Sequence, residues 1–308
     1  MIEKLDFGDF AAESDKIRYE EELFVHTRQH KAFNLPQHRI IFGRKGSGKT
    51  ALVQHISTRD RDKYAHVLDI DADSIRFKPM TEKFSLLYEK VGGSLELRKS
   101  FANIWEHSIL TSCMAHLANN ISTSSGDGAT LHNYLRKEGL LKKRIYDLLI
   151  DSLDNLFSVA LGKSGKPTSE LIQALDNFPL DNTLFEEARI SLSKFINNGH
   201  SFLITFDKID TYFEIEPDRF QNDQHERESL RFFLAGLVQA VYNISVDDYF
   251  RENLQFKVFL PLDRYNSVKS RDWDKIKKFI YKINWTHDEL VIFVSKRIAH
   301  SNSRLIIN

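Results

Sequence analysis

The chain has 308 residues, of which 42% are hydrophobic and 28% are charged, a composition that is ordinary for a folded globular protein with a sizeable core. Its 43 basic and 43 acidic residues balance, so no global field attracts the protein to nucleic acid or to a membrane surface. The single cysteine excludes an internal disulfide, and neither a secretory leader nor an apolar run long enough to cross a membrane is recognisable. We therefore expect a cytoplasmic protein without a membrane partner.

Four short apolar runs predict buried strands, at residues 39–42, 66–70, 201–206 and 256–260. The segment before them, residues 1–36, is charged and rich in acids, and we treat it as a lead-in. Because helical stretches separate the four runs, the sequence predicts an α/β fold with a mainly parallel sheet flanked by helices. The core of this fold is expected over residues 37–265.

About 130 residues separate the second and third predicted strands, far more than an ordinary crossover connection needs. Apolar residues recur there at helical spacing, for example Leu141, Ile145 and Leu148, and Thr183 with Glu186 forms the pattern of an N-terminal capping box. These features predict a helical insertion at about residues 95–200. A further helical segment is expected at residues 266–308.

Residues 43–50 match the pattern G-x-x-x-x-G-K-[ST] of a phosphate-binding loop in full, between a predicted strand and a predicted helix. Glycines in this pattern let successive backbone N–H groups approach phosphate oxygens, and the helix that follows adds its positive end. In this pattern the lysine reaches the β- and γ-phosphates and the hydroxyl of the last residue ligates Mg²⁺. We expect ATP and Mg²⁺ as cofactors, with contacts from Gly43, Arg44, Lys45, Gly46, Ser47, Gly48, Lys49, Thr50 and Ala51.

The third predicted strand closes on Asp207, where an enzyme with such a loop carries a carboxylate beside its metal ion. We expect Asp207 and Thr50 to hold Mg²⁺, although an aspartate at a strand end also caps helices or simply ends the strand. Asp210 is the candidate for polarising the attacking water, and Glu214 is the second choice. Lys208 stands where many hydrolytic members of this class carry glutamate, which predicts slow hydrolysis.

Three stretches of the chain together resemble bacterial P-loop ATPases of the ASCE type related to the STAND and KAP groups. They are residues 42–52, residues 206–210, and residues 284–290 followed by Lys296-Arg297-Ile298. The resemblance implies an ATPase that acts as a nucleotide-dependent switch or sensor with an effector partner, often in antiphage systems. It also implies a sensing arginine after the fourth strand, for which Arg264 is the candidate, three positions later than is usual.

The phosphate-binding loop is complete, but the usual glutamate after Asp207 is lacking and the candidate sensing arginine is displaced. This combination predicts slow turnover by an isolated monomer. We expect a homo-oligomer, a separate effector protein or both, with Arg264, Arg271 or Arg297 acting across an interface. A DNA-associated motor or loader is the alternative function, and a small kinase fits the long insertion less well. Basic clusters at residues 142–144 and 275–282 could contact nucleic acid, but the neutral net charge favours solvated helix faces.

Histidine and tryptophan add no further site. None of the twelve histidines shows the spacing of a metal ligand, so we expect them to be solvated or locally hydrogen-bonded. Trp105, Trp273 and Trp285 are expected to anchor the core or an interface.

Overall fold

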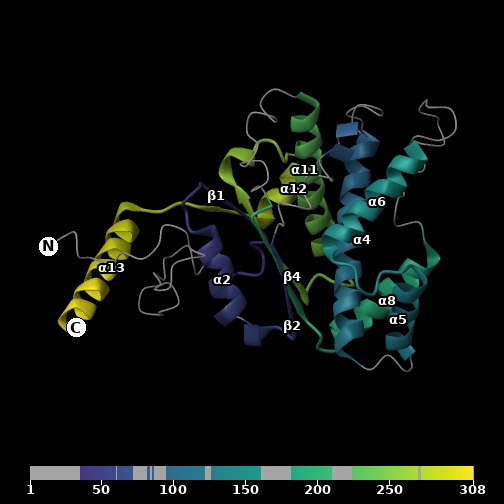
Figure 1. Ribbon diagram of the computed structural model, residues 1–308, viewed down its shortest axis with the longest axis horizontal. Helices are drawn as coiled ribbons and strands as arrows, with labels where there is room; N and C mark the ends of the chain where they lie inside the picture. The colour runs from purple at the N-terminus through teal and green to yellow at the C-terminus, as the bar shows by residue number, and fades with distance from the viewer. Residues whose placement is uncertain are drawn as a thin grey trace.

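The computed structural model describes residues 35–59, 61–71, 82–83, 85–86, 95–121, 126–160, 182–209, 224–269 and 272–307. Within these residues the chain forms a five-stranded, all-parallel sheet flanked by helices (Figure 1). The strands are β1 (Ile40–Gly43), β2 (His66–Asp71), β3 (Phe202–Asp207), β4 (Leu254–Pro261) and β5 (Ile280–Ile283). The predicted α/β fold with a mainly parallel sheet is confirmed. The predicted lead-in, up to residue 34, lies outside the described residues.

The strand order is β2-β3-β4-β1-β5, so the chain leaves β1 for one edge of the sheet and returns through β3 and β4 before adding β5. Right-handed crossovers then place the helix after β1 and the helices after later strands on opposite faces. Figure 1 shows this division, with α2 (Lys49–Arg59) on one side and α4 (Leu95–Asn120) and α11 (Gln224–Val246) on the other. Open α/β sheets bind ligands where the connections reverse, beyond the carboxyl ends of the strands.

Alternating side chains of the strands build two separate cores. Ile40 and Phe42 of β1 enter the larger core, which is formed with α4, α11 and their neighbours, whereas Ile41 enters a smaller core beneath α2. Val53 and Ile56 are the contributions of α2 to this smaller core. All four residues of β1 are buried, so the strand that carries the loop is fixed from both faces.

The remaining helices are α5 (Gly126–Lys137), α6 (Ile145–Ala160), α8 (Thr183–Asn197), α12 (Trp273–Ile276) and α13 (His287–Ile307). Helices α4, α5, α6 and α8 occupy the stretch for which the sequence predicted a helical insertion. Trp105 of α4 donates a hydrogen bond to the carbonyl oxygen of Phe233 in α11, at 3.1 Å, in the larger core. Among the described residues no helix combines the length and the apolar character that a membrane span needs.

Two details of the prediction are wrong. The N-cap of α8 is Asn182, whose side chain accepts from the backbone N–H of Leu184 at 2.9 Å, and Thr183 is already the first helical residue. Strand β5 lies within residues 266–308, where only helix was expected. It pairs with β1 at one edge of the sheet, and its partly exposed residues give it a weak apolar signal.

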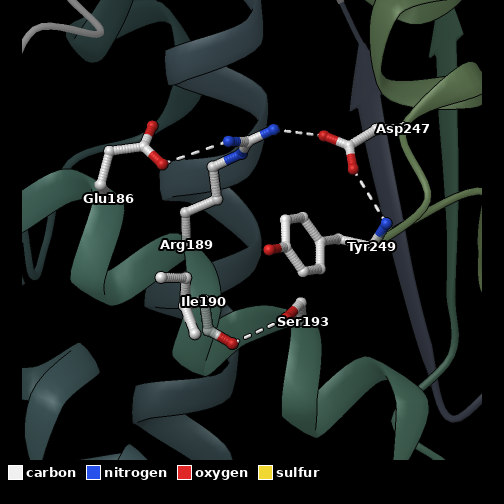
Figure 2. A network of polar contacts seen from close by, with 6 residues as sticks. All are labelled: Glu186, Arg189, Ile190, Ser193, Asp247 and Tyr249. Atoms are coloured by element: carbon white, nitrogen blue, oxygen red, sulfur yellow. Dashed lines mark hydrogen bonds and ion pairs between the residues drawn. The ribbon is translucent and has the colours of Figure 1, made fainter.

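A polar network fixes the helical layer to the turn that enters β4 (Figure 2). Arg189 of α8 contacts Glu186 at 3.2 Å through one terminal nitrogen and pairs with Asp247 through the other. The second carboxylate oxygen of Asp247 accepts from the backbone N–H of Tyr249 at 2.8 Å. The guanidinium group also lies 5.8 Å from the ring centre of Phe250, so charge and packing hold α8 at this turn together.

Candidate functional site

The predicted phosphate loop follows β1 directly and ends in the first turn of α2, at the carboxyl end of the sheet. Gly46 and Gly48 have φ values of 77° and 82°, which side-chain-bearing residues rarely adopt. Gly43 is required for another reason, because a Cβ atom at this position would lie 2.3 Å from the Oγ atom of Ser47. The loop therefore folds back on its own first residue, as a close cradle for a ligand requires.

Two side chains of the loop fit an anionic group. The Lys49 ammonium donates to the carbonyl oxygens of Gly43, at 3.1 Å, and of Arg44, at 3.2 Å, so it lies across the loop. The Ser47 hydroxyl is buried and has no hydrogen-bond partner among the described residues. A buried hydroxyl without a partner is costly in a folded protein, and a phosphate oxygen could accept a hydrogen bond from it. The loop thus fits a phosphate group on its own geometry.

Asp207 is the last residue of β3 and is only 6% exposed. Phe206 belongs to the larger core and Leu203 to the smaller core beneath α2, so by strand alternation Asp207 shares the α2 face with Leu203. Thr50 lies in the first turn of α2, at the same end of the sheet. One strand, β4, separates β1 from β3, so the two strands lie about 10 Å apart, with Asp207 at the level of Ile41, which leaves room for a hydrated ion.

A magnesium ion at this place needs few protein ligands, because one or two carboxylates and the phosphates of the nucleotide usually complete its shell. Thr50 and Asp207 are the residues that would hold it. The described residues contain no cluster of three or more histidine, cysteine, aspartate or glutamate side chains that could bind a metal ion by themselves.

Lys208, directly after Asp207, has a φ value of 57° and is the only non-glycine residue with positive φ in the described part of the chain. This left-handed conformation costs about 1–2 kcal/mol in a residue with a Cβ atom. It lets the chain turn so that Ile209 reaches the larger core, where it is fully buried. Strained residues of this kind cluster at functional sites, which marks the end of β3 independently of its sequence.

The structure describes only some of the other polar residues that the sequence predicted for the site. Arg264 lies in the short helical turn after β4, Leu262–Arg264, and its Nε atom is 3.4 Å from the neighbouring Asp263 carboxylate. Because β4 pairs with β1, Arg264 is at the same end of the sheet as the loop. Asp210, Glu214 and Arg271 lie outside the described residues.

Two further positions lie at this end of the sheet: Trp285, which the sequence predicted only as an anchor of the core or an interface, and Asp71, which it did not single out. Trp285, which follows β5, donates its indole N–H to the carbonyl oxygen of Ser47 at 3.0 Å and packs at the edge of the smaller core. Its ring also meets that of Phe293 in α13 edge to face, at 5.9 Å. Asp71 ends β2 in register with Asp207, so two acidic positions close adjacent strands.

No family model, no curated protein and no solved structure matches the chain. The site must therefore be interpreted from its own residues.

Three histidines at the opposite end of the sheet form a local chain. The Nε2 atom of His66 lies 3.0 Å from Nδ1 of His200, and its Nδ1 atom lies 3.2 Å from Nε2 of His116. Burial, followed by the two neighbouring rings, lowers the pKa of His66 to about 4, so this ring is neutral at physiological pH. The partners face different nitrogens of His66, so the three rings do not converge on one metal position.

Proposed function

We propose that the chain is a regulatory P-loop ATPase, which binds and hydrolyses ATP with Mg²⁺ and acts as a switch or sensor with an effector partner. The observation that carries the proposal is the loop at residues 43–50. This loop matches the sequence motif in full and follows a strand at which the connections of the sheet reverse. Two of its glycines have positive φ, and its lysine side chain lies across the loop. The resemblance to ASCE-type ATPases favours a switch over a metabolic enzyme, and antiphage defence as its setting.

The residues of the chain have separable tasks in this reaction. Backbone N–H groups of the loop and the amino end of α2 bind phosphate oxygens, while the Lys49 ammonium exchanges the carbonyls of Gly43 and Arg44 for phosphate. Thr50 and Asp207 would hold the metal ion, which would supply positive charge to offset that of the phosphates. Water activation falls to Asp210 or Glu214.

The expected slowness of hydrolysis follows from the residue after Asp207. Lys208 cannot accept a proton from water while it is charged, so the position directly after Asp207 supplies no general base. A cation supplied by another subunit or partner raises the rate of P-loop enzymes by roughly three to five orders of magnitude. Arg264 and Arg271 remain our candidates for this cation, whereas Arg297, in α13, is only 9% exposed and is poorly placed to reach a second subunit.

A nucleic-acid motor is less well supported, because basic residues of the two clusters have partners within the chain. Lys275 and Lys277 pair with Asp272 and Asp274, and Lys143 pairs with Asp151. The ammonium groups of Lys278 and Lys282 lie over the rings of Phe279 and Tyr265. Charges that are already matched contribute little to phosphate contacts.

Calorimetry with ATP and Mg²⁺ tests the proposal. Lys49→Ala should weaken ATP binding by about 10- to 100-fold, the value of one or two charge-assisted hydrogen bonds, and should weaken ADP binding less. Asp207→Ala should retain much of the binding and lose hydrolysis. Lys137→Ala, at the exposed end of α5, is the control. Equal ATP affinity of the wild type and Lys49→Ala would refute the assignment.

Turnover assays separate the related functions. Free phosphate as the product identifies an ATPase, whereas a phosphorylated acceptor identifies a kinase. Stimulation by DNA would favour the motor.

A further inference from the structure

Trp285 holds one peptide group of the phosphate loop from outside the loop. Its indole N–H donates to the carbonyl oxygen of Ser47 at 3.0 Å. Ser47 and Gly48 share this peptide group, and a trans peptide is planar, with its carbonyl oxygen and its N–H on opposite sides. The bond from Trp285 therefore directs the Gly48 N–H away from the indole ring.

The N–H that this arrangement presents is suited to bind an anion. Among the described residues the Gly48 N–H has no backbone acceptor, whereas the Gly48 carbonyl oxygen accepts from Leu52 in the first turns of α2. The next residue, Lys49, is the cation that lies across the loop. An N–H without a backbone partner, beside a cation and at the amino end of a helix, is the arrangement that binds phosphate oxygens.

Glycine does not by itself select this orientation of the peptide group. Gly48 has a φ value of 82°, and glycine adopts positive and negative φ about equally readily. A half-turn of the peptide between Ser47 and Gly48 would reverse the sign of this φ and put a carbonyl oxygen in the place of the N–H. Since an oxygen there would repel a phosphate group, another part of the chain must select the orientation.

Trp285 is itself held firmly enough to make this selection. Its ring packs at the edge of the smaller core and meets the ring of Phe293 edge to face. Directly after it, the Glu289 carboxylate accepts from the backbone N–H of Thr286 at 3.0 Å, and the Thr286 hydroxyl oxygen accepts from the backbone N–H of Glu289 at 3.3 Å. This reciprocal cap fixes the start of α13, and with it the backbone at Trp285.

We propose that Trp285 is a positioning residue of the phosphate loop, which holds the peptide between Ser47 and Gly48 with its N–H toward a bound phosphate. The assignment rests on the proposed function, because it requires a nucleotide in the loop. Backbone N–H groups of such loops surround the α- and β-phosphates, which ATP and ADP share. The two nucleotides therefore depend on Trp285 equally.

Calorimetry with ATP and with ADP, each with Mg²⁺, tests this role. Trp285→Phe keeps an aromatic ring on the smaller core but removes the N–H donor. It should raise the dissociation constants of both nucleotides by about two- to tenfold, the value of one hydrogen bond that keeps the loop in its binding conformation. Lys49→Ala, in contrast, should weaken ATP binding more than ADP binding.

Trp273→Phe is the matched control. It makes the same chemical change at a position where the indole N–H has no hydrogen-bond partner among the described residues. Both dissociation constants should stay at their wild-type values, because Trp273 does not contact the loop through this group. Equal melting curves with and without nucleotide-free refolding verify that both variants are folded.

Nuclear magnetic resonance of the indole N–H groups gives a second measurement, made on the wild type. The Trp285 signal, assigned by its loss in Trp285→Phe, should shift when ATP with Mg²⁺ is added. The Trp105 signal should stay, because that N–H donates to Phe233 within the larger core.

Wild-type affinity of Trp285→Phe, a loss of affinity for ATP alone, or a Trp285 signal that saturating ATP does not move would overturn the positioning role and leave the ATPase proposal standing. A wild type that binds neither nucleotide would overturn both.

Discussion

The packing of Gly43 against Ser47 makes a quantitative prediction about the loop that does not depend on any ligand. Gly43 ends β1 with ordinary strand geometry, so alanine is allowed by the backbone there and its cost arises from contact alone. The new Cβ atom would lie 2.3 Å from Ser47 Oγ, and at 3.2 Å from Lys49 Cγ and 3.3 Å from Ile283 Cδ1 it would require smaller shifts of these two side chains. The hydroxyl must move by about 1 Å, which we expect to cost about 1–2 kcal/mol, within the range for overpacking.

Urea denaturation measures this cost. With a slope of about 3 kcal/mol per molar urea, the midpoint of Gly43→Ala should fall by about 0.5 M. Ser47→Ala alone should be neutral or slightly stabilising, because it removes a buried hydroxyl without a partner. The double variant should recover most of the loss, with a coupling energy of at least about 1 kcal/mol. Unchanged stability of Gly43→Ala, or a double variant no more stable than it, would refute the packing described here.

Two further predictions concern stability. In urea denaturation, the free energy of unfolding of Lys208→Gly should be within about 1 kcal/mol of the wild-type value or higher. That of Lys208→Val should fall by about 1–2 kcal/mol, because a β-branched residue fits positive φ poorly. Equal stability of the two variants would contradict the strain at this position. Burial raises the pKa of Glu106, in α4, above 4.5, and the nearby Arg189 opposes this shift. The protonated side chain is therefore favoured in the folded state. Its contribution to stability is complete below pH 4.5 and is lost as pH rises through the folded-state pKa. Glu106→Gln should therefore raise the melting temperature more at pH 8 than at pH 4.5, and an equal change at both would contradict the assignment.

Local signals in the sequence predicted the elements that carry the loop. Buried parallel strands are nearly continuous apolar runs, which is why the runs that became β1, β2, β3 and β4 were recognised within two residues of their ends. The loop was recognised because its chemistry demands particular residues at fixed spacing. Strand β5 has neither property, since it is short, carries Lys282 and pairs on one side only.

Contacts between distant parts of the chain could not be predicted in the same way. The hydrogen bond from Trp285 to Ser47 joins residues 238 positions apart, and no periodic pattern encodes such a pair. The positive φ of Lys208 directly precedes Ile209, which is buried in the larger core, and no local pattern in the sequence predicts this conformation. Asp71 was missed because the predicted strand stopped at Ile70, one residue before the observed end.

The division of the sheet into two unequal cores affects how the molecule can respond to a ligand. The smaller core has six buried residues, Ile41, Val53, Ile56, Leu203, Phe259 and Ile283, so little apolar area holds α2 in place. Displacing α2 should accordingly cost less free energy than displacing α4 from the larger core. Trp285 packs against the same six residues, so the amino end of α2 and the start of α13 rest on a common support. A displacement of α2 would therefore reach Trp285 and the start of α13 directly, because both contact the smaller core.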